Sequence, residues 1–197
     1  MRKTLIATTV TAALALAACS DNTTPQQETA QQPAAEVTTA AEVVSSNPLM
    51  VKSTLQYEAP NFNEIKDDHF LPAFEEGMKQ HMTEVLAIAA NPEPATFDNT
   101  LVALEKSGEL LTRVSRIFYN LAGSSSNPQR REIQSELAPK MAAHSDDINL
   151  NPQLFARIKS LYNQRNELKL DSESVRLIEV YYERFVRAGA QLTEEQK

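Results

Sequence analysis

The most regular pattern of apolar and polar residues in the chain lies between residues 96 and 121. Apolar side chains recur there at steps of three and four, a spacing that places them on one face of an α-helix. Thr96 or Asp98 stands at the start, where a side-chain oxygen can accept a bond from a free backbone amide. The pattern predicts one helix of about 24 residues, roughly 36 Å long, with a face that other helices must cover. Its apolar positions are Leu101, Leu104, Leu111, Val114, Phe118 and Leu121.

Gly108 fills the one small position in this apolar row. Inside a helix a glycine costs about 1 kcal/mol relative to alanine. We therefore expect Gly108 to mark either a kink or a close contact with another helix.

Four more segments carry helical spacing together with recognisable end signals. Acidic residues and prolines occupy first turns, where both are favoured, and Gly189 stands where glycine commonly closes a helix. Pro139 lies inside one segment and predicts a kink there. With almost no strand signal, the chain is predicted to be all-α, with five helices in all. The four segments run from about Asp67 or Asp68 to Ala90, from Pro128 to Ile148, from Asn151 to Tyr162, and from Asp171 or Ser172 to Gly189.

The last of these helices carries a broad apolar sector. Tyr181 and Tyr182 are adjacent, so they point about 100° apart on a helix, and Ile178 and Phe185 flank them. Such a sector is wider than a single neighbouring helix needs. We expect it to belong to a larger core and to be exposed in this chain by itself.

Residues 1–18 have the features of a bacterial lipoprotein signal peptide. Arg2 and Lys3 precede an apolar run of secretory length, which ends in Leu-Ala-Ala before Cys19. The ending resembles a lipobox, which implies cleavage before Cys19 and lipidation of that residue. An ordinary secretory signal with a chance cysteine is the alternative. We expect a lipid-anchored protein of the cell envelope that faces the periplasm, and by the same resemblance Ser20 favours the outer membrane.

Residues 19–47 have the composition of a disordered tether. After Cys19 the stretch holds four acidic residues and no aromatic residue, lysine or arginine. Such a segment buries too little apolar surface to offset its chain entropy. The all-α part is therefore expected over residues 48–197. The formal net charge of the whole chain is −7, which argues against nucleic acid as a partner.

The sequence offers no set of residues that would perform catalysis. Its three histidines, His69, His81 and His144, belong to no His-Glu-x-x-His motif. His144 and Asp147 lie one helical turn apart but supply only two metal ligands, so we expect His144 to be a hydrogen-bonded core residue. Neither a glycine-rich phosphate loop nor a G-x-S-x-G motif occurs. We assign no catalytic, cofactor-binding or metal-binding residue, and only Cys19 as a modification site.

Five strings in residues 48–197 carry a resemblance to a known family. They occupy residues 62–78, 96–121, 136–144, 151–155 and 184–192, and the first of them reads FNEIKDDHFLPAFEEGM. Together, and in order, they resemble the amino-terminal region of bacterial peptidyl-dipeptidases, which belong to the thimet oligopeptidase family of zinc metallopeptidases.

The resemblance implies the amino-terminal helical lobe of a larger all-α enzyme with a deep substrate channel. In that family zinc is held by His-Glu-x-x-His and a further glutamate, and the motif glutamate activates water. Members remove carboxyl-terminal dipeptides from short peptides, and the amino-terminal helices narrow the channel. Since no such motif occurs in this sequence, we expect the chain alone to bind no zinc and to be inactive. Its expected partner is a missing carboxyl-terminal catalytic lobe.

The end of the sequence leaves alternatives open. Thr193 and Gln196 form the pattern of a capping box, which announces a further helix. We expect a chain cut from a longer one, and a frayed end is the alternative. The competing function is a non-catalytic helical lipoprotein that binds peptides or a protein partner. A reading frame with His-Glu-x-x-His beyond codon 197 would favour the peptidase, whereas a stop codon would favour the binding protein.

Overall fold

The computed structural model describes residues 47–193, and every regular element in that range is helical. This confirms the all-α prediction. The short 3₁₀-helices are η1 (Gln56–Glu58) and η2 (Asp67–His69), and η3 (Phe97–Val102) is a π-helix. The α-helices are α2 (Phe70–Ala89), α3 (Ala103–Lys106), α4 (Glu109–Ser124), α5 (Pro128–Asn149), α6 (Pro152–Gln164) and α7 (Ser172–Ala188).

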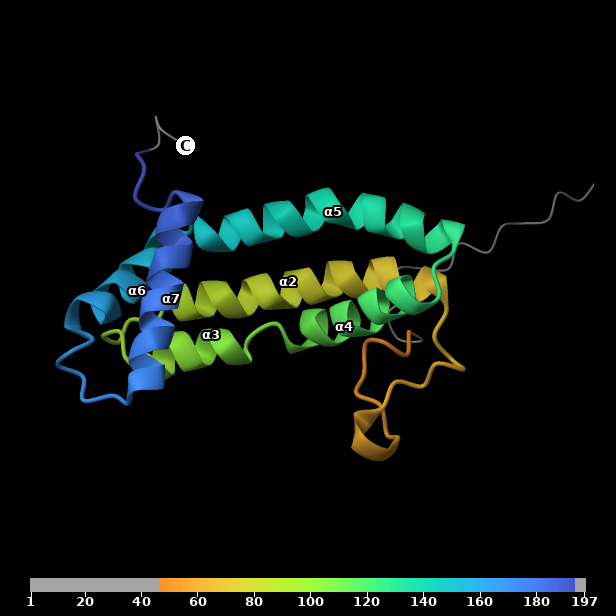
Figure 1. Cartoon of the computed structure of the whole chain (residues 1–197), viewed down its shortest axis with the longest axis horizontal. Coiled ribbons are helices and arrows are strands. Elements are labelled where there is room, and N and C mark those ends of the chain that lie inside the picture. Colours follow the sequence, from red (N-terminus) through yellow and green to blue (C-terminus); the bar gives the residue numbers. More distant parts are fainter. Residues whose placement is uncertain (1–46, 194–197) are drawn as a thin grey trace, which may run out of the picture. The chain divides into compact units, whose positions relative to one another are not determined.

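Helix α2 lies at the centre of this arrangement. In Figure 1 it runs between α5 on one side and the pair formed by α3 and α4 on the other. It contacts α4, α5 and α6, and α7 runs across the other helices and contacts α5, α6 and η3. None of the helices within residues 47–193 combines the length and apolar character needed to cross a lipid bilayer.

Two apolar cores lie along α2, one near each of its ends. The first core joins the beginning of α2 to α4 and α5, where the rings of Phe70 and Phe74 pack edge-to-face with Phe118 at centroid distances of 4.9 and 5.5 Å. The second core joins the end of α2 to η3, α3, α6 and α7, and there Phe155 stacks on Phe185 at 6.2 Å. One helix thus holds both cores together.

The single helix expected between residues 96 and 121 is interrupted at Gly108. Its first turns form η3 and α3, Ser107 is extended, and Gly108 has a φ of 71° before α4 begins. The Gly108 amide donates to a Glu84 carboxylate oxygen at 2.7 Å. A Cβ at this position would lie 2.9 Å from Cγ of His81. The expected interruption is confirmed, but the continuous 24-residue helix was wrong, because the left-handed Gly108 ends one helix and starts another.

Helices α2 and α4 approach each other closely at a different glycine, Gly77. A Cβ on Gly77 would lie 3.0 Å from Cα of Leu111. Only a residue without a side chain lets the two backbones meet at this distance, so Gly77 sets the spacing of the first core.

The helix ends predicted from the sequence are largely confirmed. Side-chain oxygens of Asn127, Asn151 and Asp171 accept backbone amide bonds of 2.7 to 2.9 Å at the starts of α5, α6 and α7. Gly189 closes α7 with a φ of 102°. Pro139 lies inside α5, which continues through it as one helix.

The apolar sector of α7 is covered, contrary to expectation. Ile178, Tyr181 and Phe185 are buried in the second core. Tyr182 stacks on Tyr162 of α6 at 3.9 Å. The sector is wide because α7 packs against several elements at once, so the expected exposed face on this helix was wrong.

Candidate functional site

A polar groove separates the two cores where α2, α3, α5 and α7 meet. Its cavity volume is about 590 Å³, which is within the usual range of a small-ligand site. We call it the histidine groove. Its polar lining consists of His81, Glu105, Ser107, His144, Ser145, Asn149, Tyr181 and Arg184.

Two histidines from different helices form a direct hydrogen bond in this groove. Nδ1 of His81 on α2 lies 2.9 Å from Nε2 of His144 on α5. Burial lowers the pKa of both rings, the His81 ring lowers that of His144 further, and Glu84 and Asp147 oppose these shifts. A neutral pair, in which one ring donates to the other, fits these surroundings.

His144 is therefore hydrogen-bonded, as expected, but it lines a groove and is only half buried. Its partner is 63 residues away in the sequence. No spacing rule connects positions that far apart, so the pair could not be predicted from the sequence.

Opposite the histidines, a tyrosine and a glutamate form a second polar contact. The Tyr181 hydroxyl donates to Oε1 of Glu105 at 2.6 Å. Burial, and then Glu105, raise the pKa of Tyr181 far above its ordinary range. The guanidinium of Arg184 lies 4.8 Å from the centre of the same ring. The phenol thus stays protonated and acts as a donor.

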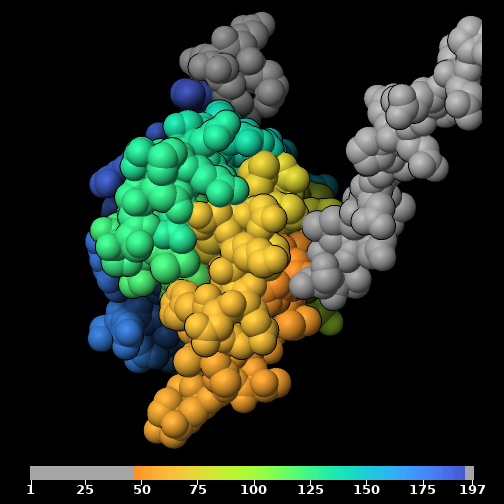
Figure 2. Space-filling view, turned by 90° about the vertical axis from the view of Figure 1, so that its right-hand side faces the viewer, coloured from red at the N-terminus to blue at the C-terminus, as the bar shows by residue number. Residues whose placement is uncertain are grey.

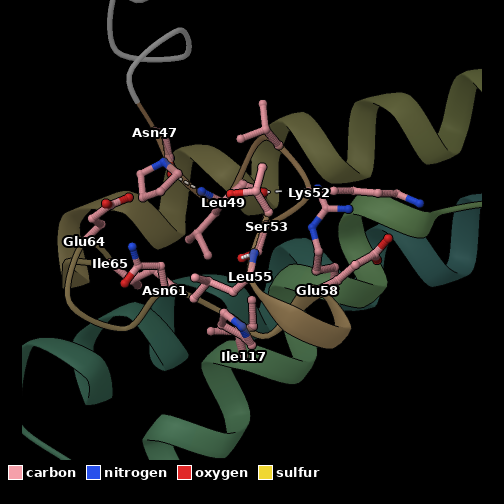
Figure 3. Close-up of a pocket in the computed structure, with 15 residues that line it drawn as sticks. Asn47, Leu49, Lys52, Ser53, Leu55, Glu58, Asn61, Glu64, Ile65 and Ile117 are labelled. Atoms are coloured by element: carbon pink, nitrogen blue, oxygen red, sulfur yellow. Dashed lines mark hydrogen bonds between the residues drawn. The ribbon is translucent and has the colours of Figure 1, made fainter.

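A second hollow lies where the amino-terminal segment folds over α4. Figure 3 shows this pocket, of about 340 Å³, with residues of the segment on one side and Ile117 of α4 on the other. Asn47 anchors the segment, because its amide donates to the His69 carbonyl at 2.8 Å and its oxygen accepts from the Leu49 amide at 3.0 Å. Leu49 is thereby inserted into the first core.

Two cations stand at the margin of this pocket. Lys52 forms an ion pair with Glu109 at 2.5 Å. Arg113 donates to the Leu49 carbonyl at 3.3 Å, and its buried Nε has no hydrogen-bond partner within the part of the chain that the structure describes. The pocket therefore borders a guanidinium with an unused donor.

Residues 51–62, most of which line this pocket, project from the helical part of the chain, and we call them the projecting segment (Figure 2). Four large apolar side chains in it are exposed, those of Val51, Leu55, Tyr57 and Phe62, and the exposed fraction of Tyr57 is 92%. Tyr57 and Glu58 both have positive φ values, of 61° and 54°. Two consecutive left-handed residues other than glycine are strained, and such strain is typical of binding surfaces.

The remaining candidates from the sequence do not gather into a metal site. Residues 47–193 hold no group of three or more histidine, cysteine, aspartate or glutamate side chains placed for one ion. Nδ1 of His69 accepts the Lys66 amide at 3.1 Å, which is a capping role. Asp67 pairs with Arg130 at 2.7 Å. Cys19, the predicted lipidation site, lies outside the described residues.

The chain resembles known bacterial peptidases. It is 44% identical to dipeptidyl carboxypeptidase of Escherichia coli K12 over 155 residues, which are 79% of this chain and 23% of that protein. The Salmonella typhimurium protein of the same name is 46% identical over 154 residues. Oligopeptidase A of Escherichia coli K12 is 20% identical over 152 residues, 77% of this chain and 22% of its own.

No family model matches the chain. The chain corresponds to about a quarter of the length of the relatives it matches. The aligned stretch nevertheless makes up most of this chain, at an identity well above 30% for two of those relatives. Over that stretch, the chain belongs to the family of bacterial peptidases that includes dipeptidyl carboxypeptidase and oligopeptidase A.

Proposed function

We propose that this chain is the amino-terminal helical part of a zinc peptidyl-dipeptidase, which removes carboxyl-terminal dipeptides from oligopeptides. The observation that carries the proposal is the identity of 44% to 46% with dipeptidyl carboxypeptidases over nearly four fifths of the chain. In this proposal the helices form one wall of the peptide channel and exclude folded proteins from it.

The described residues do not fit the zinc site of such an enzyme. A catalytic zinc takes three protein ligands and keeps an open position for water, whereas no cluster of three candidate ligands occurs within residues 47–193. We therefore assign no chemical step to this chain. The zinc, the general base and the catalytic lobe that carries them are expected from residues beyond this sequence.

A chimeric enzyme tests this role directly. The matching region of the Escherichia coli relative is replaced by residues 47–197 of this chain, and release of dipeptides from a blocked oligopeptide is measured. We expect the chimera to release dipeptides and a chelator to abolish the release. The 197-residue chain alone, with added zinc, should leave the peptide intact. A chimera that unfolds cooperatively but releases nothing would contradict the proposal, as would cleavage by the chain alone.

We further propose that Cys19 is lipidated and anchors the protein in the cell envelope, facing the periplasm. The support is the Leu-Ala-Ala-Cys string behind a basic start and an apolar run. A single acyl chain holds a protein weakly, whereas two or three give a stable anchor. Expression with labelled palmitate should label the chain and move it into the detergent phase. Retention of both properties by Cys19→Ala would refute the anchor.

A further inference from the structure

The projecting segment is bonded mainly to itself. Its backbone hydrogen bonds join neighbouring residues, such as the Glu58 amide with the Leu55 carbonyl at 2.9 Å. Among the described residues, the one ion pair or hydrogen bond that joins it to a helix is that of Lys52 with Glu109 at 2.5 Å, and more than half of each of these side chains is exposed. The helices of this chain therefore do little to hold the segment in place.

The segment also carries a large share of the exposed apolar surface. Seven large apolar side chains are exposed within residues 47–193, and four of them, including Tyr57, lie in this segment. No residue of the segment is buried, and only Lys52 and Glu58 in it are charged. Exposed apolar and aromatic side chains with few charges among them are typical of an interaction surface.

The backbone of the segment is strained at its most exposed point. Tyr57 and Glu58 both lie in the left-handed region, which residues other than glycine rarely adopt. Such conformations persist where the surrounding structure leaves the residue no alternative. Since 92% of the Tyr57 side chain is exposed, the described residues supply no such surroundings. A contact from outside them would.

The segment stands between two hollows, which leave room for such a contact. One is the pocket of Figure 3, about 340 Å³ in volume. The other, of about 730 Å³, lies between the projecting segment and α4, and Tyr57, Glu58 and Pro60 form its outer wall. A partner can therefore reach the apolar side chains of the segment without displacing a helix.

The length of the relatives indicates what covers this surface. An aligned stretch of 155 residues in a chain of 197 necessarily includes residues 51–62, yet it is only 23% of the Escherichia coli protein. About three quarters of such a protein is thus available to cover the segment. Apolar surface with few charges suits a permanently buried contact. A lipid surface fits less well, because Lys52, the only cation of the segment, is paired with Glu109 and the chain has a net charge of −7.

We propose that the projecting segment is the surface on which the remaining three quarters of the whole protein, with its catalytic lobe, packs against this helical part. Tyr57 and Phe62 become buried in that interface, and the contact holds the two left-handed residues in their conformation. The identity of the partner rests on the proposed peptidase function, whereas the choice of surface rests on the exposure and strain of the segment.

Hydroxyl-radical footprinting with mass spectrometry tests the proposal, because it measures the exposure of single side chains. It is applied to the purified 197-residue chain and to the chimera with the Escherichia coli relative. In the chain alone Tyr57 should be oxidised as fast as a free tyrosine. In the chimera its oxidation should fall nearly to that of Tyr181, which is buried in the second core and is the slow reference in both proteins.

Variants test the same contact through stability. Tyr57→Ser and Phe62→Ser should leave the thermal midpoint of the chain alone unchanged, because both side chains are exposed there. In the chimera each should lower the midpoint by several degrees, because a buried ring is lost. Leu86→Ser is the matched control, since Leu86 is 48% exposed on α2, and it should have the same effect in both proteins.

Other occupants of the surface would be visible in the chain alone. Protection of Tyr57 that increases with the concentration of the chain would assign the segment to a second copy. Protection that appears only with phosphatidylethanolamine and phosphatidylglycerol vesicles would assign it to a membrane. Either result would overturn the proposal.

The proposal would also be overturned if Tyr57 were oxidised equally fast in the chimera and in the chain, or if Leu86→Ser destabilised the chimera as selectively as Tyr57→Ser. A chimera without a cooperative transition would count against it too, because the two parts would then not fit together. An inactive chimera with protected Tyr57 would remove the peptidase function and leave the interface. An active chimera with exposed Tyr57 would do the reverse.

Discussion

At the scale of single residues, glycine positions decide how the helices meet. Gly77 permits the close approach of α2 and α4, and Gly108 supplies the single left-handed residue between α3 and α4, beside His81. Gly123 lies in α4 with open space around it. A side chain added at each of these three glycines should therefore change the free energy of unfolding by a different amount, which substitution can measure.

Replacing Gly108 by alanine should lower the free energy of unfolding by about 1–2 kcal/mol, from the left-handed backbone alone, and by more if His81 cannot move. The added Cβ would lie 2.9 Å from Cγ of His81. Gly123→Ala is the control, and we expect it to stabilise α4 by about 0.5–1 kcal/mol. Urea unfolding followed by circular dichroism measures both. Equal effects of the two substitutions would contradict the role given to Gly108.

The bonded histidines should make stability depend on pH. The pKa of both rings is lowered in the folded protein, chiefly by burial. As the pH falls below about 6.5, the unfolded chain therefore takes up protons before the folded one, and the free energy of unfolding decreases. Above that pH both rings are neutral in the folded and the unfolded chain, so they contribute no further change to the free energy of unfolding. The folded and unfolded chains bind equal numbers of protons at these rings again only when the pH is below the folded pKa values.

Urea unfolding at a series of pH values between 7.5 and 5 measures this dependence. His81→Gln and His144→Gln should each flatten the decrease below pH 6.5. His69→Gln is the control, because the His69 side chain accepts the Lys66 amide in the cap of η2 and lies outside the pair. A decrease of the same slope in all three variants would assign the effect to other groups.

At the scale of elements, helix ends were predictable because their causes are local. Asn127, Asn151 and Asp171 cap α5, α6 and α7 through amides three residues away. Contacts between distant segments were not predictable, and these include the close approach at Gly77 and the pair that His81 forms. The covered face of α7 belongs to the same class, since its covering rings come from α6.

The Asp171 cap should stabilise α7, because alanine at this position would leave a first-turn amide without its side-chain acceptor. Asp171 accepts the Ser174 amide at 2.9 Å and the Ser174 hydroxyl at the same distance. Asp171→Ala should lower the thermal midpoint, whereas Asp146→Ala should not, because Asp146 lies near the negative end of α5. A decrease of the thermal midpoint in Asp146→Ala as large as that in Asp171→Ala would contradict the capping argument.

At the scale of the whole helical unit, two surface hollows share residues at the end of α3. The histidine groove and the hollow between the projecting segment and α4 both adjoin the break between α3 and α4. Glu105 and Ser107 line both hollows. A change in the packing of α3 would therefore alter the two hollows together.

The two cores should unfold as one cooperative unit, because α2 contributes side chains to both. Leu137 is fully buried in the first core and Leu161 is 1% exposed in the second. Replacing either by alanine should cost about 2–5 kcal/mol, a large part of the stability of a small domain. If α2 couples the cores, Leu137→Ala must speed hydrogen exchange in α6 and α7 as well as in α4. Leu86→Ala is the control, because Leu86 lies on the shared helix but is 48% exposed. Faster exchange confined to α4 and α5 would show that the polar groove between the cores divides them into two independently unfolding parts.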